Sequence, residues 1–120
     1  MEPELASKIL RTVPQNNAFY FFTDIGQYDG KFAVNLADFS QKVATIKVES
    51  VDFHFKRRDF EQWIRETLGD ADLADEVNKI SKTIQGEELR AKICQIVKRR
   101  LTELKKLLAS RGSHLRRTCE

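Results

Sequence analysis

The sequence predicts an α+β fold: a small sheet of two or three strands with one packed helix, followed by a helical C-terminal half that ends in a long amphipathic helix. Two segments have strand patterns, namely the aromatic run at residues 18–25 and residues 49–56, where apolar and polar side chains alternate. From residue 59 onward, apolar side chains recur every three or four positions, which is the period of a helix. This change of period along the chain favours the α+β class.

The N-terminal part predicts a short helix and two strands. Three apolar residues at four-residue steps indicate a helix over residues 3–12: Leu5, Ile9 and Val13. Residues 18–25 are aromatic on both alternating faces, as expected of a strand buried on both sides in the middle of a sheet. The turn "GQYDG" follows, and residues 31–34 predict a short second strand.

The next segment predicts a crossover between two strands. Asn35 is a typical N-cap for a helix over residues 36–45, with Asp38 three residues on as a capping-box variant. Residues 49–56 then predict a half-buried strand. If this strand pairs parallel with residues 31–34, the crossover through the helix is expected to be right-handed.

Two further helices are predicted, each with its own start signal. Asp59 follows the predicted strand, and its carboxylate is expected to cap the first turn of a helix over residues 59–68. Gly69 ends this helix because glycine tolerates the left-handed conformation, and Asp70 caps the next helix. The apolar positions of the two helices include Phe60, Trp63 and Leu73, and we expect Trp63 to be largely buried.

The last helix is predicted over residues 87–109, with an apolar stripe whose members are spaced 4, 3, 4. The stripe consists of Val97, Leu101, Leu104 and Leu108. This helix is about 34 Å long, more than the ~30 Å diameter of the preceding body, so part of the stripe should overhang it. A two-fold partner helix is the simplest cover, and a homodimer is therefore expected. The competing prediction is that the helix folds back onto the first helix within one chain.

These elements predict one domain over residues 1–109, with a helical extension at about 87–109. Residues 110–120, "SRGSHLRRTCE", predict a flexible tail.

Charge is distributed unevenly along the chain. Residues 1–88 carry 11 Lys/Arg and 16 Asp/Glu, a net charge of −5, whereas residues 89–120 carry 10 and 2, a net charge of +8. A mildly acidic body with a basic end is compatible with self-association, an acidic partner or phosphate binding.

The composition argues against several classes of protein. The apolar runs are only a few residues long, so we expect no membrane span, and the charged N-terminus does not resemble a signal peptide. Cys94 and Cys119 do not make a disulfide framework, which favours a reducing cytoplasm. The histidines and cysteines lack metal-ligand spacing and the glycines form no phosphate-binding fingerprint, so we expect neither metal nor cofactor.

His54 is the strongest candidate for a functional polar residue. A histidine five residues before Asp59 could be a general base oriented by a carboxylate. No serine or cysteine nucleophile stands in a recognisable motif near it, however. The favoured interpretation is a structural histidine at the end of the predicted strand, hydrogen-bonded to a neighbouring carboxylate or carbonyl.

The basic C-terminal helix raises the alternative of nucleic-acid binding. Its candidate phosphate contacts are Lys98, Arg99, Arg100, Lys105 and Lys106. The helices at 59–68 and 70–81 resemble a helix-turn-helix in outline, but the second is acidic in its first turns and would face phosphates unfavourably. A solvated polar face opposite the leucine stripe is the favoured interpretation of the basic residues.

The stretch from His54 to Ala74 resembles an uncharacterised prokaryotic domain family. The shared pattern is a histidine, Asp-Phe, Trp-Ile, Gly-Asp and Leu-Ala, which this chain matches in order and spacing from His54 to Leu73-Ala74. The resemblance covers roughly residues 18–100 and implies no activity. Family members often have Gly or Asn where this chain has Arg58. Either the turn does not need a positive φ here or it is mildly strained.

The sequence therefore predicts a non-enzymatic protein-interaction or self-association module. Weak, sequence-indifferent nucleic-acid binding through the basic helix is the alternative, and an enzyme built on His54 ranks last.

Overall fold

The computed structural model describes residues 3–119, with side chains described up to residue 109. Helices and strands combine in an α+β fold, as predicted. The elements are α1 (Pro3–Leu10), the 3-10 turn η1 (Gln15–Asn17), β1 (Phe19–Asp24), β2 (Gln27–Ala33), α2 (Leu36–Thr45), α3 (Val48–Lys56), α4 (Asp59–Trp63), the π-helical turn η2 (Ile64–Leu68), α5 (Ala71–Asn78) and α6 (Gly86–Cys119).

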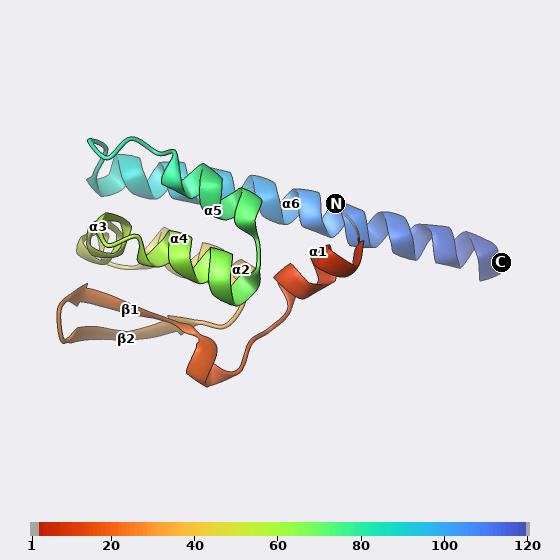
Figure 1. Ribbon diagram of the computed structural model, residues 1–120, viewed down its shortest axis with the longest axis horizontal. Helices are drawn as coiled ribbons and strands as arrows, with labels where there is room; N and C mark the ends of the chain where they lie inside the picture. Colours follow the sequence, from red (N-terminus) through yellow and green to blue (C-terminus); the bar gives the residue numbers. More distant parts are fainter. Residues whose placement is uncertain (1–2, 120) are drawn as a thin grey trace.

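The molecule is layered, with the β1–β2 hairpin at one side and α6 at the other (Figure 1). Helices α2 and α3 lie between them, because α2 contacts both β2 and α6, and α3 contacts both β1 and α6. Helices α1 and α5 also pack against α6. The long helix is therefore the support on which the helical part of the fold is assembled.

The sheet contains two antiparallel strands within the described residues, joined as a hairpin. The predicted parallel pairing of residues 31–34 with 49–56 is wrong, since β2 turns back directly onto β1. The prediction that β1 is buried on both faces is also wrong. Phe19 and Phe21 are buried, but the alternate residues Tyr20 and Phe22 are partly exposed because no layer covers the outer face.

Residues 49–56 were predicted as a strand and form helix α3 instead. The buried side chains are Ser50, Val51, His54 and Phe55, which is the i, i+1, i+4, i+5 pattern of one helical face. Apolar residues at 51, 53 and 55 fit strand alternation equally well over so short a window. Packing between β1 and α6 selects the helix, which brings His54 toward β1.

Asp59 does not cap the following helix, contrary to the sequence prediction. The N-cap of α4 is Arg58, with φ 64°, and it makes no side-chain capping bond. Asp59 is the first helical residue, and its carboxylate is drawn to His54 and Arg57. Arg58 is the described non-glycine residue with positive φ, so the turn is one that favours Gly or Asn.

The second helix junction agrees with its prediction. Gly69 has φ 85° and ends η2, and Asp70 accepts a hydrogen bond from the Leu73 N–H at 3.1 Å. The prediction for α2 also holds, since Asn35 accepts from the Asp38 N–H at 2.8 Å.

The apolar stripe of α6 is covered within the chain, so the predicted overhang is wrong for most of it. Val97, Leu101 and Leu104 are buried, and Leu108 is half-buried. Helix α1 packs on α6 and contributes Ala6 and Ile9 to the same core, whereas Leu5 is 40% exposed. The fold-back alternative therefore describes the structure.

Helix α6 is also longer than predicted. It begins at Gly86 and runs past the other elements to Cys119, so residues 110–119, expected as a tail, have helical backbone (Figure 1). Glu120, the last residue of that expected tail, lies outside the described residues.

Candidate binding cleft

A cleft of about 510 Å³ opens between β1, α3 and the α4–η2 segment. Its walls are largely aromatic, and charged side chains lie among them and at its rim. The lining residues used below are Tyr20, Phe22, Asp24, Phe53, Arg57 and Glu66, together with His54, Asp59 and Trp63. A volume of this size, with apolar walls and a few polar groups, is typical of ligand-binding clefts.

His54 is buried beside the cleft and uses both ring nitrogens. The Phe22 backbone N–H donates to Nε2 at 2.8 Å, and Nδ1 lies 2.8 Å from Asp59 Oδ2. Because Nε2 accepts, Nδ1 is the atom that carries the proton and donates to the carboxylate. Burial lowers the pKa of His54 below its ordinary value of 6.5, although the Asp59 carboxylate opposes that shift.

This arrangement is structural in form. A general base needs a free lone pair directed at its substrate, and the Phe22 N–H occupies the one that His54 has. His54 instead fixes the distance between β1 and α3 and orients Asp59 at the start of α4. The favoured sequence interpretation expected a neighbouring carboxylate or carbonyl as partner, and Asp59 is such a carboxylate, although His54 lies on helix α3 and not at a strand end.

Trp63 forms part of the opposite wall. Its side chain is 8% exposed, and its Nε1–H donates to the Asn17 carbonyl at 2.9 Å, which ties α4 to η1. Phe60 and Leu73, the other predicted core residues of this region, are fully buried. The cleft wall is therefore held by the core and not by mobile surface side chains.

The outer face of the hairpin is aromatic and exposed. We call it the hairpin face and define it by Tyr20, Phe22, Ile25, Tyr28 and Phe32. Ring centroids are 5.8 Å apart for Tyr20–Tyr28, 5.4 Å for Tyr20–Phe32 and 5.4 Å for Phe22–Tyr28. Ile25 is 77% exposed and Tyr28 47% exposed. Because Tyr20, Phe22 and Ile25 also line the cleft, the two surfaces are continuous.

The hairpin face was missed in the sequence analysis. Tyr20 and Phe22 were interpreted as one buried side of a central strand. Tyr28 was assigned to a turn, yet β2 already begins at Gln27. A hairpin register pairing Tyr20 with Phe32, and Phe22 with Tyr28, would have placed all four rings on one face.

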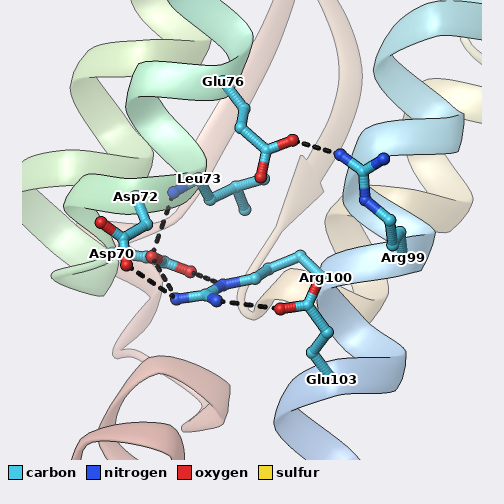
Figure 2. Close-up of polar contacts among 7 residues, drawn as sticks. All are labelled: Asp70, Asp72, Leu73, Glu76, Arg99, Arg100 and Glu103. Atoms are coloured by element: carbon cyan, nitrogen blue, oxygen red, sulfur yellow. Dashed lines mark hydrogen bonds and ion pairs between the residues drawn. The ribbon is translucent and has the colours of Figure 1, made fainter. Parts of the chain in front are cut away.

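A second polar cluster lies between α5 and α6, away from the cleft (Figure 2). The guanidinium of Arg100 donates from Nε to Asp70 Oδ2 at 2.7 Å and from its terminal nitrogen to Asp70 Oδ1 at 2.8 Å. Glu103 accepts from Arg100 at 3.4 Å. Both members of the central pair are buried, with Asp70 1% and Arg100 7% exposed. Burial alone would lower the pKa of Arg100, but the hydrogen bonds and charge of Asp70 raise it.

The candidate phosphate contacts on α6 are therefore not equivalent. Lys98, Lys105 and Lys106 are exposed. Arg99 pairs with Glu76 of α5, and Arg100 is buried against Asp70, so the structure removes Arg100 from the predicted phosphate-binding set (Figure 2). This ion pair was not anticipated, because sequence spacing alone gives no contact over 30 positions.

Among residues with described side chains, no three His, Cys, Asp or Glu residues gather as metal ligands would. Over the same part of the chain, no helix combines the length and apolarity needed to cross a membrane.

The fold and cleft together define a small α+β domain in which an aromatic hairpin is carried on a helical support. The chain belongs to a family of unknown function, DUF5752, whose model matches residues 15–115. This agrees with the resemblance to an uncharacterised domain family. Neither a curated protein nor a solved structure matches the chain significantly.

Proposed function

We propose that this domain is a non-enzymatic protein-interaction module that docks a partner on the hairpin face and the adjoining cleft. The observation that carries the proposal is the continuous, largely aromatic surface formed by Tyr20, Phe22, Ile25, Tyr28 and Phe32, of which Ile25 and Tyr28 are exposed and the others half-buried, beside a 510 Å³ cleft. Exposed contiguous apolar patches are typical of interaction sites, and aromatic residues are enriched in them.

The local chemistry supports binding over catalysis. Both nitrogens of His54 are engaged in hydrogen bonds, and Cys94 lies half-buried on α6, where burial raises the pKa of its thiol. A thiol with a raised pKa is a poor nucleophile. We propose a cytoplasmic setting for the module because its cysteine usage suits a reducing compartment.

The expected homodimer loses its original reason, because the α6 stripe is covered within one chain. Self-association stays part of the proposal only through the hairpin face, where a second copy would be one possible partner. We propose a heterologous partner as the occupant of this surface.

The test compares two surface variants in affinity capture followed by rebinding with purified components. Ile25→Ser combined with Tyr28→Ser should abolish partner binding, since these are the most exposed large side chains of the hairpin face. Leu5→Ser is the matched control, because Leu5 is 40% exposed but lies on α1. Equal binding by both variants and the unaltered chain would contradict the proposal.

Weak binding to a phosphate backbone is the second candidate function. Lys98, Lys105 and Lys106 are exposed on a helix that projects beyond the body (Figure 1). We expect binding to single- or double-stranded nucleic acid that is indifferent to sequence and decreases steeply between low and physiological salt. Lys105→Gln with Lys106→Gln should reduce the salt slope by about 2, and an unchanged slope would argue against this candidate.

A further inference from the structure

We propose that the cleft receives a cationic side chain, lysine or arginine, of a partner protein docked on the hairpin face. This inference rests on the proposed function and names the chemistry of the partner residue at the centre of the interface. Charge, unused hydrogen-bonding capacity and aromatic walls each support it.

The cleft is acidic. Asp24, Asp59 and Glu66 line it, and Arg57 is the cationic side chain among the lining residues, since His54 is neutral when its Nε2 accepts a hydrogen bond. The lining therefore has a net charge of −2. Charge complementarity favours a cation as the occupant and disfavours a carboxylate or phosphate.

Acceptor atoms in the cleft are available to such a cation. Asp59 uses Oδ2 for both His54 and Arg57, while its Oδ1 accepts no hydrogen bond from a described residue. Its side chain is 27% exposed, and Oδ1 is not among the fully buried side-chain atoms that lack a hydrogen bond. Glu66 is exposed and makes no ion pair within the described part of the chain. Two carboxylates at one cleft can accept from an ammonium or guanidinium group.

The aromatic walls suit the stem and head of a long basic side chain. Arg57 already lies with its guanidinium carbon 5.1 Å from the Phe53 ring centroid, which is the geometry of a cation–π contact. Phe22 and Trp63 line the same cleft and present further ring surface. Lysine and arginine bury their alkyl stems on apolar surface while the charged group pairs, so one side chain would use both features.

Addition of a partner strand along β1 is a less suitable alternative. The Phe22 N–H, which such a strand would need, is already donated to His54 Nε2 at 2.8 Å. The cleft is thus closed to main-chain pairing at its middle and open to side chains. A partner is expected to insert one side chain here and cover the hairpin face with apolar residues.

Trp63 provides a built-in reporter, since it is the single tryptophan and lines the cleft. The probes are capped heptapeptides with identical apolar flanks and a central lysine, arginine, norleucine, glutamine or glutamate. We expect the lysine and arginine peptides to change Trp63 emission saturably, with an affinity at least about tenfold above that of the glutamine peptide. The advantage should decrease as salt is raised.

Variants of the whole chain test the acidic groups. Glu66→Gln should lower the affinity for the lysine peptide several-fold and leave the affinity for the norleucine peptide unchanged. Glu49→Gln is the matched control, because Glu49 is an exposed acid of α3 that does not line the cleft. Thermal unfolding of both variants checks that the fold is retained.

Three results would overturn the inference: peptides that bind equally whatever their central residue, no saturable binding by any peptide, or no effect of Glu66→Gln. A free amine such as N-acetyl-lysine amide that binds as tightly as the peptide would also contradict it, by assigning the cleft to a small ligand. If the double variant Ile25→Ser, Tyr28→Ser still abolishes partner binding in these cases, the proposed interaction module is supported and only the proposed cationic side chain is wrong.

Discussion

His54 connects three elements with one side chain. It accepts from β1, donates to the first residue of α4 and projects from α3. Five aromatic side chains surround its ring, three of them within 5.5 Å between centroids: Phe19, Phe53 and Phe60. A protonated His54 would direct a second N–H at the Phe22 amide, so the folded state is compatible mainly with the neutral form.

The first prediction concerns pH. Burial depresses the pKa of His54 below 6.5 in the folded state, so at lower pH the unfolded chain binds more protons than the folded one. The free energy of unfolding should therefore be largest above about pH 6.5 and decrease as the pH drops through and below that value. Urea unfolding at pH 7.5 and 5.5 measures the difference.

The variant that tests this is His54→Leu. It should lower stability at pH 7.5 but flatten the dependence of stability on pH between 7.5 and 5.5. If the free energy of unfolding still decreases between pH 7.5 and 5.5 in His54→Leu, the dependence must be assigned to carboxylates instead.

Arg58 gives the second prediction at this scale. Its φ of 64° is left-handed, a region that costs a residue with a Cβ roughly 1 kcal/mol. Arg58→Gly should therefore not lower the free energy of unfolding, and should raise it by up to about 1 kcal/mol. Arg57→Gly should lower the free energy of unfolding, because φ at Arg57 is −86°, where a side chain causes no strain. Chemical denaturation of the pair decides, and equal losses would show that the turn stores no strain.

At the scale of elements, Asp70 has two roles that depend on each other. Its Oδ1 caps α5 by accepting from the Leu73 N–H, and both Oδ1 and Oδ2 accept from the guanidinium of Arg100 on α6. Figure 2 shows two nitrogens of the guanidinium joined to the carboxylate at the start of α5. The pair therefore fixes where α5 begins relative to the long helix.

Removing one member of this pair should be more harmful than removing both. Asp70→Ala leaves a buried guanidinium without its main partner and loses the cap, so we expect a loss of about 3–5 kcal/mol. Arg100→Met combined with Asp70→Ala should cost less than the sum of the two single changes. Asp72→Ala is the comparison: Asp72 lies 3.9 Å from the Arg100 guanidinium but its side chain is 80% exposed, so its loss should cost little. Strict additivity in the double-mutant cycle would contradict the coupling.

The stripe of α6 gives a prediction that separates burial in one chain from dimerisation. Leu104 is fully buried, so Leu104→Ala should cost about 2–5 kcal/mol in unfolding free energy, independent of protein concentration. Lys105→Ala, at the exposed neighbouring position, should change stability little. An unfolding midpoint that depends on protein concentration would instead indicate that the stripe forms an interface between two chains.

At the scale of the whole molecule, α6 sets an elongated shape. The extents are 54 × 29 × 22 Å, and the long dimension follows α6 (Figure 1). The Cα radius of gyration is 15.4 Å, above the roughly 13.6 Å expected of a compact chain of this length. The basic segment from residue 89 runs along the acidic body, where Arg99 pairs with Glu76 and Arg100 with Asp70.

We expect a 13.9 kDa monomer in sedimentation at micromolar concentration, with a frictional ratio above that of a sphere. The reason is that the stripe which was expected to pair two chains is already covered. A dimer that Ile25→Ser and Tyr28→Ser dissociate would instead make a second copy the partner of the hairpin face. A dimer that persists in that variant would contradict both the monomer and the assignment of this surface.

The sequence by itself determined the features that depend on neighbouring residues. The α+β class, the cap by Asn35, the stop at Gly69 and the burial of Trp63 each follow from local pattern or residue chemistry. Tertiary structure decided the features for which the local pattern is ambiguous or the contacting residues are distant in sequence. Residues 49–56 fit strand and helix periods equally over one or two turns, and packing against α6 selected the helix. The hydrogen bond from Phe22 to His54 joins positions 32 apart, and the bridge from Asp70 to Arg100 joins positions 30 apart. The cleft likewise brings residues 18–26 together with residues 53–67. Such contacts form because the chain buries its apolar faces together, and no window of sequence contains them.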